Sequence, residues 1–150
     1  YLDSNFNFES YSMMGISGGG WTTIVYSAID ERISKSFSVA GSYPFFLRSD
    51  VKIFGDYEQN DFELYSNVNY LELYVLGASG NNRSQTLIYN EYDRCCFSGN
   101  GYELFNNIIQ KKIFSGNFEI YLDESQTQHI ISEKSLDLIL EKLNYTIDFK

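Results

Sequence analysis

The sequence has 150 residues, of which 43% are apolar and 17% aromatic, and its formal net charge is −9. This length and apolar content predict one domain, residues 1–150, with a core of its own. The acidic balance argues against a phosphate-binding surface, so we expect no nucleic-acid partner. No apolar run approaches the roughly 18 residues that a bilayer-spanning helix needs, and we expect no membrane segment.

The first part of the chain alternates between strand and helix patterns. Ser10 to Ile16 has the composition of a buried strand, and Gly18 to Ile29 has the apolar spacing of an amphipathic helix. Ile33 to Ala40 is predicted to be a second strand. A strand, a helix and another strand in this order build a parallel sheet through a right-handed crossover.

Residues 45–69 break this alternation with a mixed polar and aromatic stretch, which we interpret as an insertion or loop excursion from the sheet. Such segments often shape substrate pockets. The carboxylates in it, including Asp56 and Glu58, are explained equally well by a solvated acidic loop. The next segment, Tyr70 to Leu76, fits both a strand and one face of a helix, and both assignments stay open.

The second half repeats the alternation. Gln85 to Asn90 and Phe118 to Leu122 are predicted strands, and the apolar residues from Tyr102 to Ile109 have helical spacing. Ser132 is a good N-cap for a last amphipathic helix. The sequence therefore predicts an α/β fold, with a mostly parallel sheet of about four strands and flanking helices.

A glycine-rich stretch lies where the first predicted strand turns into the first predicted helix, with the sequence Met14-Gly15-Ile16-Ser17-Gly18-Gly19-Gly20-Trp21. A serine becomes a nucleophile only when it has an exposed position, a neighbouring base and donors for the oxyanion. Gly15 and Gly19 leave room for a tight reversal with Ser17 in a strained backbone conformation at its apex. The pattern is typical of a nucleophile elbow, and the alternative is a glycine-rich turn with an incidental serine.

Polar residues follow three of the predicted strands. Active sites of open parallel sheets lie beyond the carboxyl ends of the strands. Ser17 follows the first strand and Asp93 the third, and His129, the only histidine, lies in the loop after the fourth. The order Ser, Asp, His along the chain is that of the α/β-hydrolase triad. Glu91 and Asp123 also stand near strand ends, but Asp93 is favoured because its strand is separate from the histidine loop.

The two cysteines, Cys95 and Cys96, are adjacent, which is not the spacing of a zinc site or of a disulfide framework. The favoured interpretation is a pair of free thiols packed near a strand end, and a redox role is the alternative. With one histidine and no paired ligand motif, we expect no metal site and no cofactor.

Several of these stretches resemble one family. Ser12 to Pro44, which contains the glycine-rich turn and then Val39-Ala40-Gly41-Ser42, resembles the elbow region of bacterial-type α/β hydrolases. Acetyl-xylan-esterase-like and prolyl-oligopeptidase-like members are included in that likeness. Ile88 to Asp93 resembles the strand that carries the triad acid, and Gln128 to Ser132 resembles the histidine loop and the start of the final helix.

The resemblance implies the C-terminal half of an α/β-hydrolase fold. It implies Ser17 as nucleophile, Asp93 as acid and His129 as base, with the Gly18 amide as one oxyanion donor. Members of the family place several strands before the elbow, and their second oxyanion donor comes from that region. We therefore expect upstream strands or a partner subunit to complete the sheet, and weak catalysis by this stretch alone.

Three functions follow as hypotheses. The first is a serine hydrolase that cleaves a small-molecule carboxylic ester through an acyl-serine intermediate. The second is a serine peptidase of the same fold acting on a peptide, and the third is a catalytically incompetent fragment or interaction domain that lacks the N-terminal strands.

Overall fold

The computed structural model describes residues 5–48 and 54–145. Its strands form a single sheet made of β1 (Tyr11–Ile16), β2 (Ile33–Val39), β3 (Ser84–Asn90) and β4 (Asn117–Asp123). The strands lie in the order β1-β2-β3-β4, and each neighbouring pair is parallel. The predicted α/β fold with a parallel sheet of four strands is confirmed.

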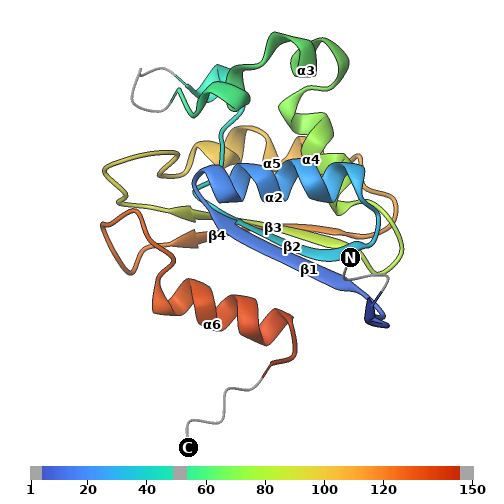
Figure 1. The fold of residues 1–150 in the computed structure, drawn as a ribbon. Coiled ribbons are helices and arrows are strands. Elements are labelled where there is room, and N and C mark those ends of the chain that lie inside the picture. Colours follow the sequence, from blue (N-terminus) through green and yellow to red (C-terminus); the bar gives the residue numbers. More distant parts are fainter. Residues whose placement is uncertain (1–4, 49–53, 146–150) are drawn as a thin grey trace, which may run out of the picture.

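Helices cover both faces of the sheet (Figure 1). α2 (Gly18–Ile29), α4 (Tyr70–Ala78) and α5 (Asn106–Gln110) lie on one face, and α6 (Glu133–Lys142) lies on the other. α3 (Phe62–Asn67) lies farther from the sheet, beyond α4. Within the described ranges, no helix combines the length and the apolar content that crossing a membrane requires.

Two hydrophobic clusters hold these layers together. The larger one lies under α2, α4 and α5 and includes Trp21, Tyr74 and Leu87, while the smaller one includes Ile88 and, from α6, Ile139. Leu87 and Ile88 are neighbours in β3 and enter different clusters, because successive side chains of a strand point to opposite faces. Both faces of β3 are therefore buried, as is usual for a strand inside a parallel sheet.

The ambiguous segment after residue 69 is a helix, α4, and its N-terminus shows why. The Asn69 side chain accepts hydrogen bonds from the amides of Leu71 and Glu72 at 3.0 and 3.1 Å, and the Glu72 carboxylate accepts one from the Asn69 amide at 2.8 Å. This reciprocal capping box satisfies N–H groups that the first helical turn leaves without partners. Capping therefore favours the helix where hydrophobic spacing alone did not decide.

Between β2 and α4 the chain leaves the sheet, in the region of residues 45–69. Its described part contains α3 and two short 3-10 helices, Phe45–Leu47 and Tyr57–Asn60, and residues 49–53 lie outside the described residues. The Arg48 guanidinium ties this segment together by donating to the Tyr43 carbonyl at 2.7 Å and to Gln59 Oε1 at 3.1 Å.

The prediction of one continuous helix from Tyr102 to Ile109 is wrong. A 3-10 helix at Gly101–Leu104 and the short helix α5 replace it. Phe105 lies between them with φ −124° and ψ −18°, which are outside the helical values. The apolar residues with helical spacing therefore belong to two short helical segments of different pitch.

Arg83 precedes β3 and is almost completely buried, with 8% of its surface exposed. Its guanidinium donates to the carbonyl groups of Ile33 at 3.1 Å, Leu76 at 3.1 Å and Ser79 at 2.8 Å, and also to that of Ser27. Ser27 and Leu76 lie in the last turns of α2 and α4, where carbonyl groups lack intrahelical partners and the helix dipoles favour a cation. This one side chain therefore joins two helix ends to the sheet.

We expect Arg83→Met to lower the free energy of unfolding by about 3 kcal/mol, because it leaves several buried carbonyl groups without donors. Urea denaturation measures the change. Arg32→Met is the matched control, since Arg32 is 61% exposed and its ion pair with Asp30 lies at the surface. That substitution should change stability far less, because a surface ion pair is screened by solvent, and equal effects of the two would contradict the assigned role of Arg83.

Candidate active site

Ser17 is the single residue between β1 and α2. Its backbone has φ 57° and ψ −125°, a left-handed conformation that is rare for a residue with a side chain. The Ser17 amide donates to the Val39 carbonyl at 3.0 Å, and the Ser17 carbonyl accepts from the Trp21 amide at 3.0 Å. Hydrogen bonds to β2 and α2 therefore hold the residue in this strained conformation. Its hydroxyl has no hydrogen-bond partner within residues 5–48 and 54–145.

The glycines around Ser17 differ in how much space a side chain would have at each position. A β-carbon on Gly15 would lie 2.3 Å from the Gly19 carbonyl oxygen, and one on Gly20 would lie 2.8 Å from the Gly41 Cα. A β-carbon on Gly19 would meet nothing within 4 Å. The expectation that both Gly15 and Gly19 make room for the turn is therefore wrong for Gly19, which faces open space. Gly20 is the second sterically required glycine, because it packs against the chain that follows β2.

Asp93 and His129 lie 36 positions apart in the sequence and are joined in the structure. His129 Nδ1 lies 2.6 Å from Asp93 Oδ2, the distance of a charge-assisted hydrogen bond in which the ring N–H donates. The Asp93 side chain is 1% exposed and that of His129 is 23% exposed. The other carboxylate oxygen, Asp93 Oδ1, accepts from the Cys95 amide at 2.7 Å. Each oxygen of this buried carboxylate therefore has a donor, and the imidazole is fixed through Nδ1.

The second ring nitrogen of the histidine, His129 Nε2, is buried and has no hydrogen-bond partner among the residues described. The Ser17 hydroxyl is also without a partner, and no hydrogen bond joins it to His129. The structure thus brings two of the three predicted triad residues together, while the third lies on its own turn. Catalytic hydrogen bonds without substrate are often long and tighten only when substrate binds.

Asp123, one of the alternative acids, makes hydrogen bonds that hold the histidine loop, the segment between β4 and α6, to α6. It is fully buried and accepts from the Ser125 amide at 2.8 Å, from the Ser135 hydroxyl at 2.6 Å and from the Ser132 hydroxyl. Burial raises the pKa of Asp123, but the hydrogen bonds from Ser125, Ser132 and Ser135 together outweigh it and leave the pKa lowered. Asp123 is therefore a carboxylate that anchors the start and end of the loop.

The other alternative acid, Glu91, makes no hydrogen bond to His129, because Nδ1 of the ring is bonded to Asp93 and Nε2 has no partner among the described residues. Asn90, which the sequence analysis does not single out, does reach the histidine loop. It is completely buried at the end of β3, and its Nδ2 donates to the Ile130 carbonyl at 3.1 Å. The position of this amide at the end of a strand predicted to lie inside the sheet was the available signal, because a buried amide requires a partner.

The segment between β2 and α4 approaches the elbow. A β-carbon on Gly18 would lie 2.9 Å from Asp56 Oδ2, which places this carboxylate against the first residue of α2. Gly18 is also the residue whose amide is the expected oxyanion donor. The amides of a first helical turn are the ones without intrahelical acceptors, so they are open to an incoming oxygen.

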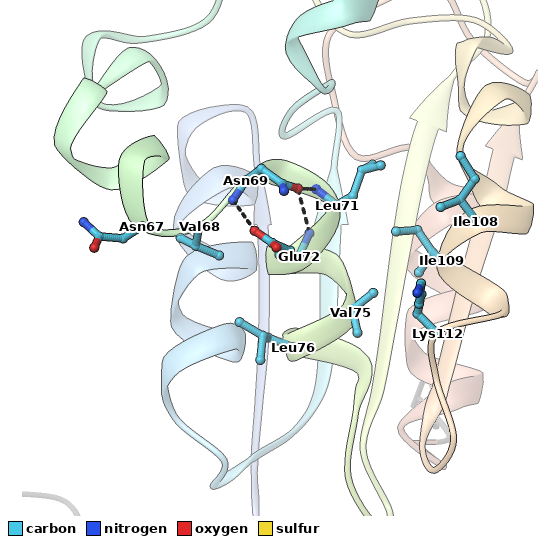
Figure 2. Close-up of a pocket in the computed structure, with 10 residues that line it drawn as sticks. All are labelled: Asn67, Val68, Asn69, Leu71, Glu72, Val75, Leu76, Ile108, Ile109 and Lys112. Atoms are coloured by element: carbon cyan, nitrogen blue, oxygen red, sulfur yellow. Dashed lines mark hydrogen bonds between the residues drawn. The ribbon is translucent and has the colours of Figure 1, made fainter.

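Two hollows lie away from these residues. A groove of about 630 Å³ runs between α4 and α5, where Val75, Leu76 and Ile108 supply apolar walls and Lys112 lies at one end (Figure 2). A second one, of about 430 Å³, is lined by Phe45, Tyr65, Tyr70 and their neighbours. Neither includes Ser17, Asp93 or His129 among its lining residues, so we do not assign the acyl-binding site to either.

Cys95 and Cys96 form a disulfide with each other. The expected pair of free thiols is therefore wrong. Both cysteines lie in the loop that follows β3, and in this loop the Cys95 amide donates a hydrogen bond to the Asp93 carboxylate. The turn that fixes Asp93 therefore also contains the disulfide.

No protein-family model and no curated protein matches the chain. Among solved structures the chain is similar to acetyl xylan esterase 1 from a Thermoanaerobacterium species, with a TM-score of 0.50 and 16% sequence identity. The match covers 85% of this chain and 43% of the esterase, so the chain spans less than half of the esterase's length. This likeness concerns the fold alone, and it agrees with the predicted α/β architecture of parallel strands with flanking helices.

We expect Gly15→Ala to lower the free energy of unfolding by about 2–4 kcal/mol, because its β-carbon would overlap the Gly19 carbonyl and force the elbow to shift. Gly19→Ala is the matched control, since that site is open and alanine is the better helix former by up to about 1 kcal/mol. Thermal unfolding of both variants measures the difference. A Gly15→Ala protein as stable as Gly19→Ala would show that the turn is looser than described.

Proposed function

We propose that this chain carries the nucleophile, acid and base of a serine hydrolase that cleaves a carboxylic ester. Ser17 is the proposed nucleophile, His129 the base, Asp93 the acid and the Gly18 amide an oxyanion donor. The observation that supports this assignment most is the hydrogen bond between the buried Asp93 carboxylate and His129, beyond the same ends of the strands at which strained Ser17 lies. A buried carboxylate on Nδ1 leaves Nε2 as the nitrogen that can accept a proton.

The mechanism follows from these roles. His129 Nε2 takes the proton of the Ser17 hydroxyl as its oxygen attacks the ester carbonyl, and Asp93 stabilises the imidazolium that forms. The Gly18 amide donates to the oxyanion of the tetrahedral intermediate. The intermediate collapses to an acyl-Ser17 ester as His129 returns the proton to the leaving alcohol. His129 then deprotonates a water molecule that attacks the acyl carbonyl, and it returns this proton to the Ser17 oxygen as the acid leaves.

The fold likeness to an acetyl xylan esterase favours ester cleavage. A serine peptidase with the same residues is the second candidate, and a panel of acyl esters and peptide amides separates the two. The open edge of β1 supports a further part of the proposal. Among the described strands β1 pairs only with β2, and Met14 in it is 47% exposed, so upstream strands or a partner subunit would cover this edge.

We expect Ser17→Ala to abolish labelling of the protein by a fluorophosphonate probe, because the probe reacts only with an activated serine hydroxyl. Intact-protein mass spectrometry measures the adduct on wild type and variant. Labelling that persists on another serine would overturn the assignment of the nucleophile. Wild-type ester turnover no higher than that of Ser17→Ala would favour the non-catalytic interaction domain.

We expect Asp93→Asn to lower kcat for an ester substrate by about 10⁴-fold, because an amide cannot hold the reactive tautomer of His129 or stabilise its cation. Steady-state hydrolysis measures the loss. Glu91→Gln is the matched control, since Glu91 follows the same strand and makes no hydrogen bond to His129. Its kcat should stay within a few-fold of wild type. A larger loss for Glu91→Gln than for Asp93→Asn would exchange the roles of the two carboxylates.

A further inference from the structure

A cluster next to the proposed catalytic residues is made of Cys95, Cys96 and His129. The proposed hydrolysis uses His129 but gives no role to the two cysteines. One ligand atom from each residue, the two sulfurs and a ring nitrogen, lies within 4.8 Å of the other two. Cys95 is exposed, and Cys96 and His129 are partly buried, so the cluster is open to solvent on one side. The two sulfurs are bonded to each other, and in this state they are poor ligands for a cation.

The surroundings of His129 are those of a metal-binding imidazole. Its Nδ1 is hydrogen-bonded to the buried Asp93 carboxylate at 2.6 Å, and such a bond fixes the orientation of the ring and leaves the other nitrogen as the one that can bind a cation. That nitrogen, Nε2, is buried and has no partner in the described part of the chain. Two thiolates and one imidazole match the preference of soft and borderline divalent cations such as Cd²⁺ and Zn²⁺.

We propose that reduction of the Cys95–Cys96 disulfide creates a three-ligand site for a thiophilic divalent cation, made of both cysteines and His129. A dithiol reductant gives two electrons and two protons to the disulfide and becomes a cyclic disulfide itself, leaving two thiols on the protein. The cation binds the two sulfurs and the free imidazole nitrogen, and the two thiol protons leave to solvent. A water molecule completes a tetrahedral coordination.

Occupation of this site makes His129 unable to accept a proton, because the lone pair that would receive it is bound to the cation. The oxidised protein is then the active form, and the reduced protein with a bound cation is inhibited. This second half rests on the proposed function, whereas the binding of the cation does not. Asp93 keeps the ring oriented in both states through its hydrogen bond to Nδ1.

The test begins with wild-type protein reduced by a dithiol and freed of it by gel filtration without air. A thiol titration counts the released thiols, and addition of Cd²⁺ is followed by the ultraviolet charge-transfer absorbance of thiolate bound to metal. We expect saturation at one Cd²⁺ per chain for the reduced protein and no such absorbance for the oxidised protein. Ser17→Ala should bind Cd²⁺ as wild type does, which makes the result independent of hydrolysis.

Cys96→Ser and Cys95→Ser should each lower the affinity for Cd²⁺ by at least about tenfold, because each removes one thiolate ligand. Far-ultraviolet circular dichroism checks that both variants are folded. Wild-type protein that releases no thiol, or that releases both and binds no Cd²⁺, overturns the proposed site. Unchanged affinity in both variants does the same. If the reduced wild-type protein binds Cd²⁺ and keeps its esterase activity, the proposed inhibition is overturned, while the proposed binding site stands.

Discussion

Parallel pairing of the four strands is the constraint on which the other features depend. Because every strand runs in the same direction, β1, β3 and β4 end at one edge, and the loops leaving them carry Ser17, Asp93 and His129. The helices between the strands contribute residues to the core, such as Trp21 and Tyr74, but none of these three side chains. The core therefore fixes the strand ends, and the chemistry is left to single residues in the loops beyond them.

The histidine loop is held by buried polar groups rather than by packing alone. Asp123 ties the start of the loop to the first turn of α6, and Asn90 binds the carbonyl of Ile130, next to His129. Such groups stabilise a single loop conformation because each would lose its partner if the loop moved, and a buried unpaired carboxylate or amide is costly. The position of His129 thus depends on residues from β3, β4 and α6 together.

The strands and their order along the chain could be predicted because hydrophobic period and turn residues are local signals. The Asp93–His129 pair was predictable as well, since the parallel sheet fixes where strand ends meet. Other features depend on contacts between distant segments. The different steric needs of Gly19 and Gly20 arise from packing against residue 41, and Asn90 has a role only because the histidine loop returns to β3. The proximity of Cys95 and Cys96 to His129 also arises from contacts between distant segments, so no local spacing of ligand residues in the sequence indicates it.

Asp93 connects the proposed chemistry to the disulfide. Its two oxygens have one donor each, His129 Nδ1 on one side and the Cys95 amide on the other. The carboxylate is almost without solvent contact, so water cannot replace either donor at little cost. Cys95, which supplies one of these donors, is also bonded to Cys96, so the disulfide lies in the turn that holds the carboxylate. The acid, the base and the turn at Cys95 therefore form one hydrogen-bonded unit, in which the buried carboxylate holds the imidazole ring through Nδ1.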